Sequence, residues 1–83
     1  MERFNSLELR YKGSLLKKNA VYLMLTNYQH YTVTLYYWDR FFIEHYYDDE
    51  LGQATRITLA NAKDLDKFLK EISITGLGLS SLQ

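Results

Sequence analysis

The chain of 83 residues contains no cysteine and no proline, and it has only four glycines. Without cysteine it can form neither a disulfide bond nor a thiolate nucleophile. Small secreted domains commonly depend on disulfides, so their absence favours a reducing compartment. No segment has the proline-rich or glycine-rich composition of a linker. We therefore expect a single domain that spans residues 1–83.

Long apolar runs are also missing from the sequence. No stretch approaches the 18 apolar residues that a membrane-spanning helix requires. Residues 1–10 contain no apolar run of the kind found in signal peptides. These absences predict a cytoplasmic protein with no membrane segment.

Charge is balanced overall but unevenly distributed along the chain. The sequence has 10 basic and 10 acidic residues. Residues 1–18 hold five basic and two acidic residues, whereas residues 19–53 hold one basic and five acidic residues. The central part of the chain is therefore acidic, which disfavours a polyanionic partner there.

Four segments have the alternation and the β-branched or aromatic composition of strands, namely residues 21–26, 31–38, 41–48 and 54–59. Asp39-Arg40 is expected to form a tight turn, and the polar loop before the fourth segment contains Gly52. Because the connections are short, we predict a four-stranded antiparallel meander.

A helix is predicted directly after the meander. Asn61 is a good N-cap, and Asp64 follows at the spacing of a capping box. The helical spacing i, i+3, i+4, i+7 then places four apolar residues on one face: Leu65, Phe68, Leu69 and Ile72. This helix is expected to pack on the sheet, which gives an α+β fold. Residues 75–83 are expected to form a flexible tail or to dock on a surface.

The N-terminal segment, residues 1–18, has two interpretations. Phe4, Leu7, Tyr11 and Leu15 have the spacing of a helix face, whereas Leu7, Leu9 and Tyr11 alternate like a strand. We favour a helix over part of this segment.

Aromatic residues are concentrated in the predicted sheet, where ten of the thirteen lie between Tyr22 and Tyr47. If the C-terminal helix buries one face, the other face would carry a large aromatic patch, and such patches mark partner sites. The candidate interaction face consists of Tyr22, Tyr36, Trp38, Phe42 and Tyr46. We predict that it binds a protein partner or forms a homodimer. The alternative is that the N-terminal segment covers it.

Binding of single-stranded nucleic acid is the rival prediction, because bases stack on aromatic sheet faces. At fold level, a meander followed by a helix is similar to the single-strand-binding domains of transcriptional coactivators and Whirly proteins. This function would require basic residues beside the aromatic face, and the candidates are Lys12, Lys17, Lys18 and Arg40. The acidic central segment argues against it.

No residue pattern commits the chain to catalysis, a cofactor or a metal, and we predict a non-enzyme. Glu44 and His45 are adjacent in one strand, so their side chains should point to opposite faces. Glu44 is expected to face solvent or to pair with Arg56. The acidic residues 48–50 lack the calcium-loop pattern and should form a solvated hairpin turn, and two histidines without cysteine make no zinc set.

One weak family pattern runs through residues 13–74. It comprises Gly13, Leu15-Leu16, Leu35-Tyr36, the run 41–47 and Arg56-Ile57. Through these residues the chain resembles short uncharacterised bacterial proteins of unknown function. The resemblance implies a bacterial protein but carries no activity, cofactor or site. His45 stands where this pattern leads us to expect an aliphatic residue.

Overall fold

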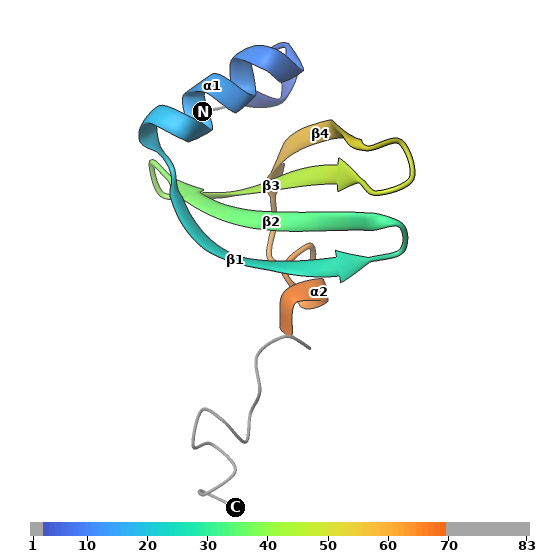
Figure 1. The fold of residues 1–83 in the computed structure, drawn as a ribbon. Helices are drawn as coiled ribbons and strands as arrows, with labels where there is room; N and C mark the ends of the chain where they lie inside the picture. The colour runs from blue at the N-terminus through green and yellow to red at the C-terminus, as the bar shows by residue number, and fades with distance from the viewer. Residues whose placement is uncertain (1–2, 70–83) are drawn as a thin grey trace, which may run out of the picture.

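The computed structural model describes residues 3–69, and Figure 1 shows the arrangement of their helices and strands. In chain order the elements are a 3₁₀ helix η1 (Phe4–Ser6), the helix α1 (Leu9–Asn19), the strands β1 (Val21–Tyr28), β2 (Tyr31–Trp38), β3 (Phe41–Asp48) and β4 (Gln53–Ala60), and the short helix α2 (Asp66–Leu69). The strand order β1-β2-β3-β4, with every neighbouring pair antiparallel, confirms the predicted meander.

Two-residue turns connect the first three strands. Asp39 and Arg40 form the β2–β3 turn with φ values of 53° and 69°, and Gln29 begins the β1–β2 turn with a φ of 57°. Positive φ at both central residues matches the right-handed twist of the flanking strands. The predicted tight turn at Asp39-Arg40 is therefore confirmed.

Helices lie on opposite faces of the sheet (Figure 1). The segment η1–α1 covers one face, called the α1 face, with a core of Phe4, Leu16, Ile43 and Ile57. Helix α2 covers the other, the α2 face, with a core of Val33, Leu35, Tyr46 and Phe68. The predicted N-terminal helix is confirmed over Leu9–Asn19. The protein is mostly sheet with helices added, which agrees with the α+β class.

The start of the C-terminal helical segment follows the prediction closely. The backbone N–H of Asp64 donates to the side-chain oxygen of Asn61 at 2.9 Å, and the N–H of Asn61 donates to the Asp64 carboxylate at 2.8 Å. This reciprocal pair is the expected capping box. The segment then makes a single helical turn, α2, in which Phe68 is buried but Leu69 is exposed. The prediction that Leu69 lies on the buried helix face is therefore wrong.

The remainder of the predicted helix, including Ile72, lies outside the described residues, as does the predicted tail 75–83.

Candidate functional site

The five aromatic residues predicted to form one interaction face are divided between the two faces of the sheet. Tyr36 and Trp38 pack against the core of the α1 face, and Tyr22 lies opposite Tyr36 with their rings edge to face at 6.2 Å. Phe42 and Tyr46 instead belong to the core of the α2 face. The prediction of one shared face is therefore wrong.

The length of the β2–β3 turn explains this division. A two-residue turn places Trp38 opposite Phe41 and Tyr37 opposite Phe42. Residues directly opposite each other in an antiparallel pair point to the same face. Phe42 therefore points to the face of Tyr37, away from Tyr36 and Trp38. The predicted two-residue turn already determines which residues of β2 and β3 share a face, because turn length fixes hairpin register.

Exposure narrows the candidate surface to one strand. Of the five predicted residues only Tyr22 is more than half exposed, at 54%, whereas Tyr46 is only 5% exposed. The neighbours of Tyr22 in β1 are also open to solvent, with Val21 at 59%, Leu23 at 43% and Leu25 at 46%. These four residues, Val21, Tyr22, Leu23 and Leu25, are called the β1 patch below.

Strand β4, at one edge of the sheet, is capped by the N-terminal segment. The backbone N–H of Leu59 donates to the side-chain oxygen of Asn5 at 2.8 Å. Lys12 Nζ donates to the carbonyl oxygens of Ile57, at 2.6 Å, and Asn5, at 3.1 Å. Burial lowers the pKa of Lys12 below its usual value. These contacts satisfy backbone groups of β4 that would otherwise be open to another strand.

Strand β1, at the opposite edge, has no comparable cap. Within residues 3–69, the backbone of β1 has no hydrogen-bond partner outside its own ladder with β2. The strand contains no charged residue, and natural proteins commonly use charged residues, proline or bulges to protect edge strands. One bulge lies between Tyr22 and Met24, but from Met24 to Tyr28 the register with β2 is regular. The two edges therefore differ in their availability for pairing.

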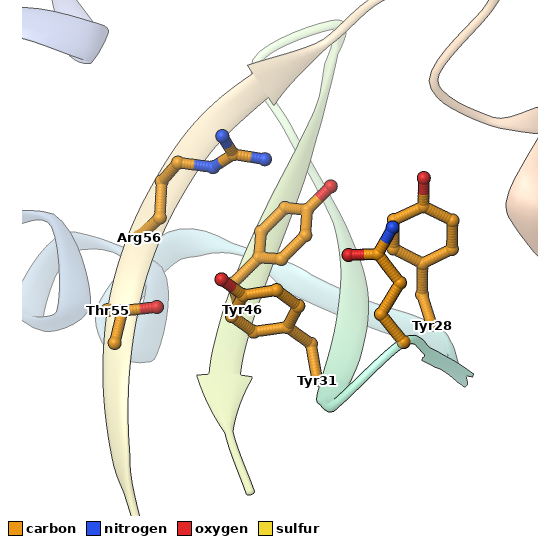
Figure 2. Close-up of a pocket in the computed structure, with 6 residues that line it drawn as sticks. Tyr28, Tyr31, Tyr46, Thr55 and Arg56 are labelled. Carbon is orange, nitrogen blue, oxygen red and sulfur yellow. The ribbon is translucent and has the colours of Figure 1, made fainter. Parts of the chain in front are cut away.

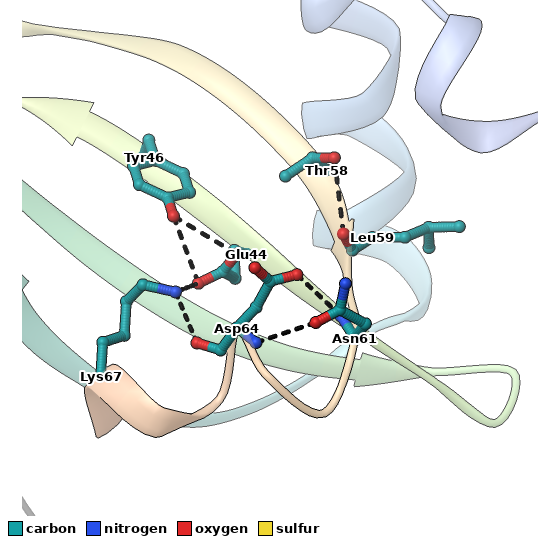
Figure 3. A network of polar contacts seen from close by, with 7 residues as sticks. All are labelled: Glu44, Tyr46, Thr58, Leu59, Asn61, Asp64 and Lys67. Atoms are coloured by element: carbon teal, nitrogen blue, oxygen red, sulfur yellow. Dashed lines mark hydrogen bonds and ion pairs between the residues drawn. The ribbon is translucent and has the colours of Figure 1, made fainter. Parts of the chain in front are cut away.

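Glu44 is neither solvent-facing nor paired with Arg56, so that expectation is wrong. Its carboxylate is buried on the α2 face and forms an ion pair with Lys67, and the Tyr46 hydroxyl lies 3.4 Å from both carboxylate oxygens (Figure 3). Lys67 Nζ also donates to the carbonyl of Asp64 at 2.5 Å. Burial acts to lower the pKa of Lys67, but the hydrogen bond and charge of Glu44 outweigh it and raise the pKa. The pair joins α2 to the sheet.

His45 points to the α1 face, opposite to Glu44, as predicted. It lies across from Thr34 on one side and Ile57 on the other, and its side chain is partly buried. Burial lowers the pKa of His45, and a backbone hydrogen bond offsets only part of that effect. The structure thus does not bring Glu44 and His45 together at one site.

The acidic turn after β3 is held by hydrogen bonds to the buried side chain of Asp48. Asp48 is buried, and its carboxylate accepts hydrogen bonds from the backbone N–H groups of Glu50 and Leu51 at 2.9 and 3.0 Å. The second oxygen of Asp48 lies 3.3 Å from His30 Nε2. Ligand atoms of His30, Asp48 and Glu50 lie within 4.8 Å of one another, but the bonds of Asp48 already explain its position. The expectation of a solvated turn is therefore wrong for Asp48.

The four basic residues required for nucleic-acid binding differ in their position and in their exposure to solvent. Lys12 is buried and bonded to β4, which removes it from the surface. Lys17 and Lys18 lie in the last turn of α1, and Arg40 lies in the β2–β3 turn. Three of the four therefore remain accessible.

Comparisons with protein-family models, with curated proteins and with solved structures found no match. Within residues 3–69, no helix is long and apolar enough to cross a membrane.

Proposed function

We propose that this protein is a non-enzymatic assembly module, in which the β1 edge pairs with the β1 edge of a second copy. The difference between the two sheet edges carries this proposal: β4 is capped by Asn5 and Lys12, whereas β1 is uncapped within the described residues and displays the β1 patch. An uncapped edge with apolar side chains is a template for strand pairing.

A second copy of the chain fits this edge because β1 carries no charge. In an antiparallel pair related by a two-fold axis, each strand faces its own sequence, so any charged residue could meet its like-charged equivalent. The sequence of β1, VYLMLTNY, contains no such residue. Pairing of β1 with its equivalent would extend each four-stranded sheet across the axis, and the register of β1 with β2 is regular from Met24 to Tyr28.

The proposal assigns different roles to the five predicted interface residues. Tyr22 belongs to the β1 patch and is buried on assembly. Tyr36 and Trp38 support the α1 face, and Phe42 and Tyr46 support the α2 face, where they already contact the cores of a single chain. Aromatic residues are common at the centre of such interfaces, which is consistent with the role of Tyr22.

A non-enzyme is favoured because Glu44 and His45, the pair considered for catalysis, lie on opposite faces of the sheet. Glu44 is neutralised by Lys67 on one face, and His45 lies on the other. Nucleic-acid binding is less well supported, because Lys12 caps β4 and the aromatic residues do not form one platform.

The experiment compares the sedimentation-derived mass of the wild-type chain with that of two matched variants. Leu25→Lys introduces a charge into the β1 patch and should give a monomer, because two copies would place these charges close together. Leu51→Lys makes the same change at an exposed leucine in the β3–β4 turn and should remain dimeric. A wild-type monomer at all concentrations, or a Leu25→Lys dimer, would contradict the proposal.

A further inference from the structure

A pocket of about 440 Å³ lies at the end of the sheet that holds the β1–β2 and β3–β4 turns. We call it the tyrosine pocket. It is lined by Tyr28, Gln29, Tyr31, Tyr46, Thr55 and Arg56. Figure 2 shows Arg56 and Thr55 on the β4 side, Tyr28 on the β1 side and Tyr31 and Tyr46 between them. Its volume falls in the range of small-molecule sites.

Arg56 supplies a positive charge that no described acidic residue neutralises. Its guanidinium carbon lies 4.1 Å from the centre of the Tyr46 ring, a cation–π contact that restricts its position. Within residues 3–69 its side chain takes part in no ion pair and no hydrogen bond. No aspartate or glutamate lines the tyrosine pocket. The N–H groups of Arg56 are therefore available to an anion.

The other cation near this face is already neutralised. Lys67 lies 5.7 Å from the Tyr28 ring, but its charge is paired with Glu44. The pocket is thus served by one uncompensated charge, that of Arg56, and by the neutral polar groups of Gln29 and Thr55.

The surroundings limit how much negative charge a ligand can carry. Asp48, Asp49 and Glu50 lie in the neighbouring turn, which the backbone N–H of Asp49 joins to the carbonyl of His30 at 2.9 Å. These carboxylates oppose a second negative charge at the same end of the sheet. A monoanion can contact Arg56 and is repelled less by these carboxylates than a dianion would be.

The tyrosine rings favour a flat ligand. Tyr31 packs edge to face on Tyr46 with ring centres 5.4 Å apart, and Tyr28, which is 37% exposed, lies on the β1 side of the pocket. Aromatic groups bind between such rings by offset or edge-to-face contact. We propose that the tyrosine pocket binds a small aromatic carboxylate, with the carboxylate at Arg56 and the ring between Tyr28 and Tyr31.

Three one-ring probes test this proposal by separating charge from shape. Benzoate is a monoanion, benzamide is its neutral analogue, and phenyl phosphate is largely a dianion at mildly alkaline pH. Each is titrated into the isotopically labelled full chain while backbone amide shifts are followed by NMR. Benzoate should give saturable shifts at Gln29, Tyr31, Thr55 and Arg56, and it should bind more tightly than either of the other probes.

Two variants identify the residue responsible. Arg56→Gln should weaken benzoate binding by about tenfold, because a charge-assisted hydrogen bond is lost. Arg10→Gln removes the same charge from an exposed position of α1 and should leave binding unchanged. Arg56→Lys keeps the charge but loses the bidentate geometry of the guanidinium group, so it should bind benzoate more weakly than wild type. This variant replaces Arg56→Gln in the comparison if Arg56→Gln does not fold.

The absence of saturable benzoate shifts would overturn the proposal, as would equal benzoate affinity in wild type and Arg56→Gln. Tighter binding of phenyl phosphate than of benzoate would also overturn it, by assigning the pocket to phosphorylated ligands. The Leu25→Lys variant should retain benzoate binding, so this result is independent of the proposed dimer.

Discussion

At the residue scale, the ion pair between Glu44 and Lys67 is the interaction whose loss is expected to lower the stability of the fold most. Both side chains are withdrawn from water, and each is the partner that makes burial of the other tolerable. Replacing Glu44 with glutamine keeps its shape but leaves the lysine charge uncompensated. We predict that Glu44→Gln lowers the free energy of unfolding by about 2–3 kcal/mol.

Urea denaturation of the single and double variants measures this effect. Adding Lys67→Met to Glu44→Gln should cost less than the sum of the two single changes, because the pair is lost only once. Lys63→Met changes an exposed lysine of the same segment and should have little effect. Additive losses in the double variant would show that the two side chains do not interact in solution.

His45 should make stability depend on pH in the mildly acidic range. Burial lowers the pKa of His45 in the folded chain below the 6.5 of an unfolded chain, so the unfolded state binds the proton more readily. The free energy of unfolding should therefore fall as the pH drops below 6.5 and should be fully restored above it.

Denaturation of the His45→Gln variant across this pH range tests the assignment. The variant should lose the part of the slope that lies just below pH 6.5. A wild-type slope that survives in His45→Gln would assign the pH dependence to other groups.

At the scale of elements, the N-terminal segment acts as a cap for the β4 edge. The amide of Leu59 donates to Asn5, which lies more than fifty positions earlier in the chain. We predict that Asn5→Ala accelerates hydrogen exchange of the Leu59 amide by about tenfold, because loss of that bond opens the edge locally. Asn27→Ala, in β1, serves as the control and should leave this amide unchanged.

The elements themselves were largely predictable, because alternation and turn composition are local properties. The predicted second and third strands coincide with β2 and β3, and the capping box at Asn61 was also foreseen. The predicted first strand starts where β1 does but ends two residues too early, and the predicted fourth strand is one residue short of β4 at each end. The connection between the predicted first and second strands, residues 27–30, is shorter in the structure. Asn27 and Tyr28 extend β1 because they pair with Thr32 and Tyr31 in the ladder.

The candidate site was less predictable, because it depends on contacts between distant segments. Nothing local to Lys67 indicates that it reaches Glu44, and nothing local to Lys12 indicates that it caps Ile57. The grouping of Phe42 and Tyr46 with Trp38 was avoidable, since the two-residue turn at Asp39-Arg40 already fixed the register.

At the scale of the whole molecule, the fold is a sheet with two unlike edges and a helix packed on each face. The N-terminal segment caps the edge at β4, and helix α2 packs below β1 on the α2 face. The backbone edge of β1 remains uncapped within residues 3–69. The dimer proposed above uses β1 alone, and pairing through one edge of each copy would give a closed dimer rather than a fibre.

The most direct test of this proposal is amide hydrogen exchange measured at high and at low protein concentration. Outward-facing amides of β1 should be protected at high concentration and exchange rapidly after dilution, whereas the Leu59 amide on β4 should be protected equally in both. Protection of β1 that does not change with concentration would contradict the account, because the edge would then be covered within a single chain.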